Sequence, residues 1–425
     1  MKFKPDFSFA VEMDQADPLA HFRERFNLIQ RENRNPEIYL CGNSLGLQPK
    51  TADDFVREEL EDWKLLGVKG HFSGDRPWMP YHEFLTEKTA GLVGGLPTEV
   101  INMNSLTVNL HLMMVSFYRP TKARHRILLE KPAFPSDRYA VESQASYHGY
   151  DDTALLEIGP RDGEQVIREE DLYTLIEEQG ETIALILLPG VQYYSGQYFD
   201  LQKITELGQR KGCVVGFDLA HAAGNLPMKL HDWNVDFACW CSYKYLNSGP
   251  GAVAGCFVHE RHAKNTSLQR FAGWWGHDKS TRFQMGPEFS PIPTAEGWQL
   301  SNPPILALAP VMASLEIFAE AGMPALREKS LLLTGYLEYL LRTRVAENIE
   351  IITPTEPKNR GCQLSLCVRG SDPKLGQRIF KALEAEGVTC DWREPDVIRV
   401  APVPLYNQYA DVYRFTEILE RTCNT

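Results

Sequence analysis

Short apolar runs alternate with amphipathic stretches between residues 98 and 260. Continuous apolar runs predict buried strands, and the stretches between them have helical period. The expected strands cover 98–105, 126–130, 182–188, 213–220, 235–242 and 252–260, and the expected helices cover 107–118, 134–146 and 201–212. Buried strands separated by helices indicate a mostly parallel sheet with helices on both faces.

The pattern changes after about residue 305. Long helical periods at 312–322 and 326–345 are followed by a strand-like run at 361–370, a helix at 377–387 and a second apolar run at 397–407. This order is typical of a small α+β unit. We therefore expect a large domain at 50–305, and a small domain formed by 1–49 and 306–425.

Composition and charge narrow the function class. The 425 residues are 43% hydrophobic and carry a formal net charge of −12, which argues against a nucleic-acid or anionic-membrane partner. The N-terminal stretch has no apolar core of signal-peptide type. Nine scattered cysteines without a CxxC pair predict no zinc or other metal site and a reducing compartment, so we expect a cytoplasmic protein.

Three loops at the carboxyl ends of expected strands carry polar side chains, and ligands bind at that edge of a parallel sheet. Ser105, Leu106 and Thr107 open a helix, where free backbone N–H groups favour a phosphate. Asp218 ends a second strand. Lys244 follows a third, and a lysine in an apolar site can form a Schiff base. Taken singly, these residues also fit an N-cap, a capping aspartate and a lysine that reaches solvent.

Together the three loops fit pyridoxal 5′-phosphate (PLP). This cofactor needs a lysine for its aldehyde, an acid for its ring nitrogen and a cradle for its phosphate. Phe134, in the loop after 126–130, can cover the ring face. Tyr243, next to Lys244, can donate to the phosphate. The combined spacing therefore predicts a PLP-dependent enzyme.

Longer blocks in the chain resemble the kynureninase family, a group of fold-type-I PLP hydrolases among the class V aminotransferases. The blocks span nearly the whole chain in the family's order: YLCGNSLGLQPK (39–50), NSLTVNLH (104–111), GFDLAHAAGN (216–225), DFACWCSYKYLNSGPG (236–251), GWWGH (273–277), LSNPPI (300–305) and IRVAPVPLYN (398–407). The resemblance implies an α/β fold with a mostly parallel seven-stranded sheet, flanking helices and a smaller α+β domain.

The resemblance also implies residue roles. Lys244 would hold the cofactor covalently, Asp218 would face its ring nitrogen, and Tyr243 would complete the catalytic set. The other cofactor-binding residues would be Leu106, Thr107, Phe134, Pro135, Ser136, Asp137, His221, Trp274 and Asn302. The substrate would be bound by Ser44, His71, Trp274, Asn302 and Arg399, with Arg399 on its α-carboxylate. Alone, His71, Trp274, Asn302 and Arg399 read as ordinary loop, packing, turn and salt-bridge residues.

The activity implied by this resemblance is hydrolysis of L-kynurenine, or its 3-hydroxy derivative, to anthranilate or 3-hydroxyanthranilate and L-alanine. Such an enzyme serves tryptophan catabolism or NAD biosynthesis. The family builds its active site at the interface of a homodimer, so we expect a homodimer in which some pocket residues come from the partner chain.

Three alternatives remain at this stage. A cysteine desulfurase would need a reactive thiol on a mobile loop, whereas Cys362 and Cys367 lie in a strand-like run. An aminotransferase would need a keto-acid second substrate. A non-catalytic binding protein on the same fold is disfavoured by the joint presence of Lys244, Asp218, Tyr243 and Arg399.

Overall fold

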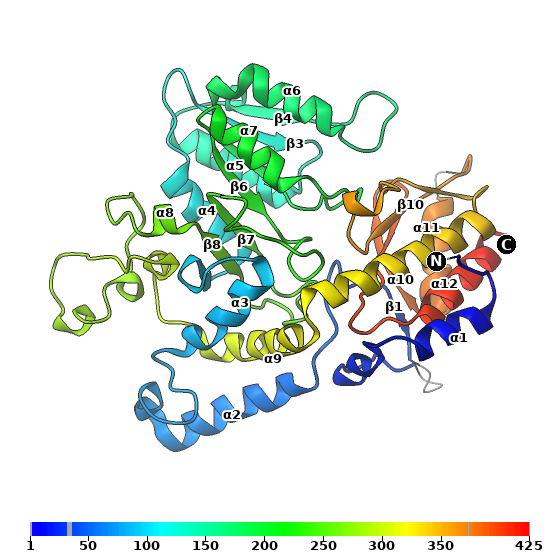
Figure 1. Cartoon of the computed structure of the whole chain (residues 1–425), viewed down its shortest axis with the longest axis horizontal. Coiled ribbons are helices and arrows are strands. Elements are labelled where there is room, and N and C mark those ends of the chain that lie inside the picture. Colours follow the sequence, from blue (N-terminus) through cyan, green and yellow to red (C-terminus); the bar gives the residue numbers. More distant parts are fainter. Residues whose placement is uncertain (1, 32–35, 373, 425) are drawn as a thin grey trace.

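The computed structural model describes residues 2–31, 36–372 and 374–424. A large helix-covered sheet and a smaller sheet lie side by side, and both chain termini lie beside the smaller one (Figure 1). The helices are α1 (Phe7–Gln15), α2 (Thr51–Leu66), α3 (Thr86–Val93), α4 (Leu106–Phe117), α5 (Pro135–Tyr147), α6 (Glu169–Gln179), α7 (Leu201–Arg210), α8 (Glu260–Ala263), α9 (Ile305–Ala321), α10 (Met323–Arg344), α11 (Leu375–Ala385) and α12 (Tyr409–Cys423).

The large sheet has seven strands in the order β2-β8-β7-β6-β5-β3-β4. They are β2 (Val100–Asn102), β3 (Arg126–Glu130), β4 (Leu155–Ile158), β5 (Ile183–Pro189), β6 (Val214–Asp218), β7 (Phe237–Trp240) and β8 (Gly255–Val258). Strands β4, β3, β5, β6 and β7 pair in parallel, and β8 and β2 pair antiparallel at one edge. The prediction of a mostly parallel α/β sheet is confirmed.

Strand β5 shows why the apolar runs are continuous. Ile186 and Leu188 point into one hydrophobic cluster, which also contains α6, α7 and α9 side chains. Leu185 and Leu187 point into another, with side chains of α4 and α5. Because successive strand residues face opposite sides, a sheet covered on both faces has no polar alternation.

The smaller sheet is antiparallel, in the order β12-β13-β10-β9. Its strands are β9 (Ile349–Ile351), β10 (Leu364–Val368), β12 (Asp391–Arg393) and β13 (Val397–Val400). A separate parallel pair joins β1 (Ile38–Tyr39) to β11 (Val388–Thr389), so the N-terminal segment packs with the C-terminal part of the chain.

Helix α10 connects the two parts. Its first residues, Met323 and Leu326, belong to the large sheet's cluster, whereas Leu333 to Leu341 pack with β10, β13 and α12. Helix α9 packs entirely on the large sheet's side. Helix α9, which we expected in the small domain, thus packs in the hydrophobic cluster of the large sheet. The domain boundary at residue 305 stays a proposal.

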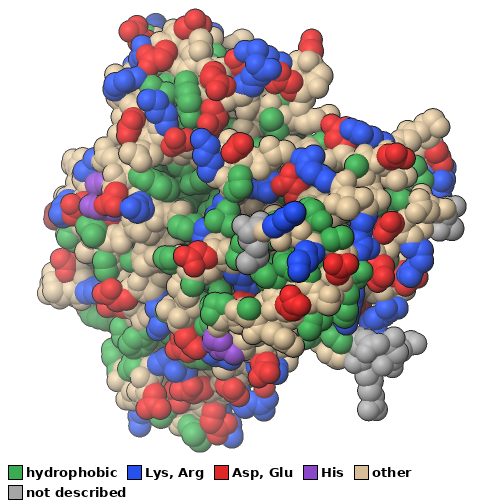
Figure 2. All heavy atoms as spheres, turned by 45° about the vertical axis from the view of Figure 1, so that its right-hand side comes forward, with side chains coloured by type: hydrophobic (Ala, Val, Ile, Leu, Met, Phe, Trp, Pro, Cys, Tyr) green, Lys and Arg blue, Asp and Glu red, His purple; other side chains and the backbone are tan. Residues whose placement is uncertain are grey.

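Acidic and basic side chains are interspersed over the face in Figure 2. Among the described residues, no single helix is long and apolar enough to cross a membrane. Only α9 and α10 taken together, bent by 80°, meet that criterion by length and composition.

Candidate active site

A cavity of about 170 Å³ lies at the carboxyl ends of the parallel strands. The residues that line it are Ser105, Leu106, Thr107, Glu130, Phe134, Ser136, Asp137, Pro189, Val191, Tyr193, Asp218, Ala220, His221, Tyr243 and Lys244. The structure thus brings together most of the residues expected to hold the cofactor, from loops that are far apart in the sequence.

Two helix N-termini border this cavity. Helix α4 follows β2 through a tight turn in which Asn104 has a positive φ of 51°. Its N-cap, Ser105, makes no side-chain capping bond, so free N–H groups of the first turn remain available for an anion. Thr107 Oγ1 lies 2.8 Å from Ser136 Oγ in the first turn of α5. The two helix starts thus lie side by side and offer donors that suit a phosphate.

Lys244 lies in the loop after β7. Its Nζ is 3.1 Å from His221 Nε2 and 5.7 Å from the centre of the Phe134 ring. The N-terminal segment fixes this loop, because the Gly46 N–H donates to the Tyr243 carbonyl at 2.8 Å. A Cβ at residue 46 would lie 2.4 Å from the Lys244 carbonyl oxygen, so only glycine permits this approach.

Buried carboxyl groups surround the lysine. Asp218, the last residue of β6, accepts a hydrogen bond from the Ala220 N–H at 2.7 Å and shares one with Asp137. Burial, reinforced by Asp218, raises the pKa of Asp137 well above its usual range. Burial raises the pKa of Glu130 to about 8. Both shifts favour the protonated carboxyl groups, which limits the negative charge around Asp218.

His221 is held neutral. Burial, followed by the positive charges of Lys244 and Arg399, lowers the pKa of His221 well below 6.5. Its Nδ1 and the Oδ1 of Asp137 are buried without a hydrogen-bond partner in the described structure. Unpaired buried polar atoms are unfavourable, and a bound heteroaromatic ring with polar substituents can pair with both. The lining therefore fits PLP.

Arg399 approaches the site from β13. It is 1% exposed, donates to the Tyr193 carbonyl at 2.6 Å through Nη1, and forms an ion pair with Asp391. Burial lowers the pKa of Arg399 to about 10, so the side chain stays charged at neutral pH. Ser44 lies nearby. Its side chain forms a hydrogen bond with the Cys41 thiol, and the positive charge of Arg399 also lowers the pKa of that thiol.

Six predicted residues do not line this cavity: Ser44, His71, Pro135, Trp274, Asn302 and Arg399. Pro135 is the first residue of α5 but does not face the cavity. His71 packs edge-on against Trp78, with ring centres 5.3 Å apart. Trp274 is 40% exposed and borders a separate hollow, and Asn302 is exposed.

Sequence reasoning overlooked two lining residues. Glu130 ends β3 as Asp218 ends β6, so the rule that ligands lie at strand ends could have identified it. Tyr193 packs edge-on against Phe134 at 5.3 Å and presents its carbonyl to Arg399. No sequence signal marks Tyr193, because its role depends on the distant β13.

The thiols do not resemble a desulfurase site. Cys362 is fully buried, and burial raises its pKa to about 12. Cys367 lies within β10, and burial and Asp396 raise its pKa to about 12. A nucleophilic thiol is exposed and has a lowered pKa, so neither cysteine suits sulfur transfer.

Comparison with known proteins finds relatives that match nearly the whole of this chain. The model of the kynureninase C-terminal domain matches residues 326–419. A kynureninase of Koribacter versatilis is 59% identical over 96% of both chains. A kynureninase of Myxococcus xanthus is 57% identical over 98% of this chain and 97% of the relative.

Solved structures show the same fold at low identity. An apo cysteine desulfurase from Thermococcus onnurineus NA1 superposes with a TM-score of 0.73 and 15% identity, over 91% of this chain and 95% of that chain. A variant of the enzyme C-DES, with glycine covalently linked to its PLP cofactor, gives 0.77 and 16%, over 93% and 98%. At this identity the likeness establishes the fold alone.

Proposed function

This chain belongs to the kynureninase family, and from that premise we propose how the residues around Lys244 carry out its reaction. The chain is a PLP-dependent enzyme that hydrolyses kynurenine in the kynurenine pathway. When bound, PLP joins the amine of an amino acid through its aldehyde and withdraws electrons from the adjacent carbon. The convergence of Lys244, Asp218, His221 and two helix N-termini on one cavity carries the proposal.

Lys244 anchors the cofactor and then moves protons. Its Nζ lies among Phe134, His221 and Tyr243 in the cavity. The free amine of Lys244 would be the base for the substrate's α-proton. The neutral His221 ring at 3.1 Å accepts a hydrogen bond from Nζ and holds the lysine in place.

Asp218 would hold the ring nitrogen of the cofactor. Its carboxylate sits at the end of a rigid parallel strand and is fixed by the Ala220 N–H. A carboxylate there keeps the ring nitrogen protonated. The raised pKa of Asp137 favours its protonated form, which would donate to Asp218 rather than repel it. The N–H groups of Leu106 and Thr107 would hold the phosphate.

Arg399 and Tyr243 act on the substrate. The Arg399 Nε is buried without a partner, and we assign it to the substrate α-carboxylate, with Ser44 beside it. Burial raises the pKa of Tyr243 far above neutrality, so its hydroxyl carries a proton. That proton can go to the β-carbon when water has added to the γ-carbonyl and the Cβ–Cγ bond breaks, giving anthranilate and alanine.

The remaining pocket residues come, in this proposal, from a second copy of the chain. His71, Trp274 and Asn302 lie outside the Lys244 cavity of their own chain. Large apolar side chains near them are exposed, namely Trp63, Val68, Phe72, Phe283 and Met285. Burying such a surface favours association. We therefore propose a homodimer in which the partner supplies the aryl pocket.

Three finer points belong to the same proposal. His71 and Asn302 offer polar atoms that could select a 3-hydroxy group on the ring, so 3-hydroxykynurenine is a candidate substrate. The pathway role is tryptophan catabolism or NAD biosynthesis. All described cysteines are free thiols, which is typical of a reducing compartment and supports a cytoplasmic location.

The direct test is product analysis with a complementation control. The enzyme with PLP should release anthranilate and alanine in equal amounts from L-kynurenine, and no sulfide from cysteine. Lys244→Ala and Asn302→Ala should each be inactive alone, yet regain part of the activity when their chains are exchanged into mixed dimers. Sulfide release would contradict the reaction, and failure of the mixed dimers would contradict the shared site.

A further inference from the structure

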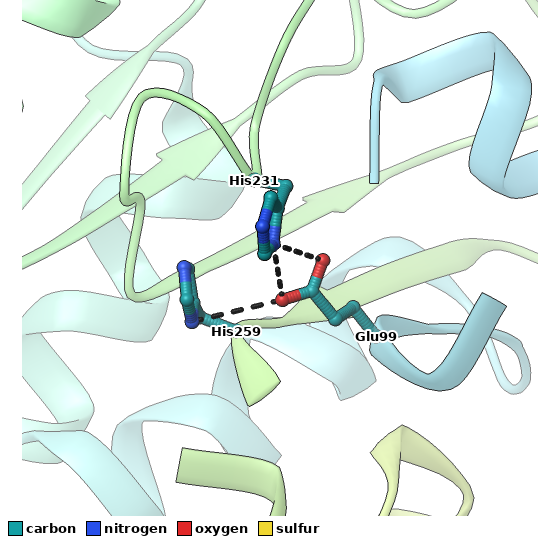
Figure 3. Close-up of side chains that lie close together, drawn as sticks. All are labelled: Glu99, His231 and His259. Atoms are coloured by element: carbon teal, nitrogen blue, oxygen red, sulfur yellow. Dashed lines mark hydrogen bonds and ion pairs between the residues drawn. The ribbon is translucent and has the colours of Figure 1, made fainter. Parts of the chain in front are cut away.

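Glu99, His231 and His259 converge at the end of the large sheet opposite the cofactor cavity (Figure 3). Glu99 directly precedes β2 and His259 directly follows β8. Because β2 and β8 are antiparallel, these ends meet. His231 comes from the loop that leads into β7. The cluster thus lies at the other end of the sheet from the active site, although the loop that carries His231 also carries His221.

The three side chains place their ligand atoms close together. One oxygen of Glu99, Oε1, lies 3.0 Å from His231 Nδ1 and 3.6 Å from His259 Nδ1, and the ligand atoms all lie within 4.8 Å of one another. The ring centres of the two imidazoles are 5.1 Å apart and the ring planes are inclined by 16°, and dashed lines in Figure 3 join both rings to Glu99. Tetrahedral zinc with bonds of about 2.0–2.1 Å separates its ligands by roughly 3.4 Å, so the ligand atoms must move closer and one ring must turn before all three bind one ion.

Hydrogen bonds from backbone N–H groups orient the carboxylate of Glu99. Glu99 is fully buried, and its two oxygens accept hydrogen bonds from the N–H groups of Glu260 at 2.8 Å and Leu96 at 2.9 Å. Such outer contacts orient ligating carboxylates. Within the described chain, no lysine or arginine nitrogen forms an ion pair with Glu99. Its negative charge is therefore not neutralised by a permanent cation.

His259 supplies a lone pair. Its Nδ1 accepts the Arg261 N–H at 3.2 Å and lies 3.6 Å from Glu99 Oε1. Two acceptors opposed at 3.6 Å are unfavourable unless a cation lies between them. His231 is 32% exposed and leaves a path for an ion.

A second cluster shows the contrast. His82, Glu83 and Glu296 also lie close together. There, however, the ammonium of Lys279 is 2.9 Å from Glu83 and 2.7 Å from Glu296. The protein fills that place with its own cation, so of these two clusters among the described residues, the Glu99 cluster is the one left open to a metal ion.

We propose that Glu99, His231 and His259 bind one divalent ion of the zinc class, with water as a fourth ligand, as a structural clasp. Two imidazoles and a carboxylate suit Zn²⁺ or Co²⁺ rather than Ca²⁺ or Mg²⁺. On binding, the proton of His231 Nδ1 moves to Nε2, and the long bond from Arg261 to His259 is replaced by the metal bond. No local sequence pattern indicates this site, because Glu99 and His231 are 132 residues apart.

The test uses the PLP-loaded enzyme after treatment with a chelator. Zn²⁺ is titrated in competition with a chromophoric chelator, and Co²⁺ is added separately to record its visible absorption. We expect one tight Zn²⁺ per chain, a tetrahedral Co²⁺ spectrum, and binding at least about a hundredfold weaker in His231→Gln. The matched control, His21→Gln, changes an exposed histidine elsewhere and should bind like the wild type.

Kynurenine turnover serves as a second readout. Because the cluster lies at the opposite end of the sheet, the metal-loaded enzyme, the metal-free enzyme and His231→Gln should all hydrolyse kynurenine at similar rates. The proposal is overturned if the wild type binds no stoichiometric Zn²⁺, or if His231→Gln binds it equally well. If His231→Gln does not fold, His259→Gln and the Co²⁺ spectrum of the wild type decide by the same criteria.

Discussion

Glu130→Gln tests the proposed protonation of the cavity. Glu130 is buried beside Asp137 and Asp218, and burial raises its pKa to about 8. An acid with a raised pKa keeps its proton in the folded state after the unfolded chain has lost it. Stability therefore falls as pH rises above about 4.5 and stops falling near pH 8. Glutamine has the same shape and does not titrate.

The magnitude follows from the pKa difference. Each pH unit between the two pKa values is equivalent to about 1.4 kcal/mol. Wild type should therefore lose roughly 3 kcal/mol relative to Glu130→Gln between pH 5 and pH 7. For a chain of this length, about 1 kcal/mol moves Tm by about 1 °C. The difference in Tm should widen by about 3 °C in favour of the variant.

The assay is thermal unfolding of cofactor-free protein between pH 5 and pH 8.5, followed by tryptophan fluorescence. Glu178→Gln, which changes an exposed glutamate, is the control, and its Tm should follow the wild type at every pH. A Tm difference for Glu130→Gln that is the same at pH 5 and pH 7 would refute the reasoning. So would a difference that moves in favour of the wild type.

Three further variants probe the site. Asp218→Ala should lower kcat by about a hundredfold or more, because an electrostatic contact to the reacting system is lost, while PLP binding measured by absorbance weakens less; equal losses would contradict the role. Arg399→Ala should raise KM for kynurenine by about tenfold to a hundredfold with a smaller change in kcat; an unchanged KM in steady-state kinetics would remove Arg399 from the substrate site. Gly46→Ala should loosen the Lys244 loop and raise the Kd for PLP, because its Cβ would meet the Lys244 carbonyl at 2.4 Å; an unaltered Kd would show that this contact is not needed.

Particular elements show what the sequence could predict. The apolar runs at β3, β5 and β6 identified the sheet, since full burial on both faces leaves a local signal. Strand β4 was missed, because three of its four residues are only half-buried at the edge of the sheet. Helix α6, with a broken apolar pattern, was missed as well.

Some residues of the active site could likewise be predicted from the sequence, and others could not. Lys244, Asp218 and Thr107 follow strands directly, so their convergence could be predicted from the geometry of parallel sheets. The contact of Arg399 with the Tyr193 carbonyl joins residues from different sheets, and no local pattern encodes it. The cluster of Glu99, His231 and His259 depends likewise on the pairing of β2 with β8.

The central claim is that Lys244 holds the cofactor. Borohydride reduction of the PLP-loaded enzyme, followed by peptide mapping by mass spectrometry, tests it most directly. The account predicts a single reduced pyridoxyl group on the peptide that contains Lys244, and none in Lys244→Ala treated in the same way. A label on another lysine, or an unlabelled Lys244 peptide from active enzyme, would contradict the account.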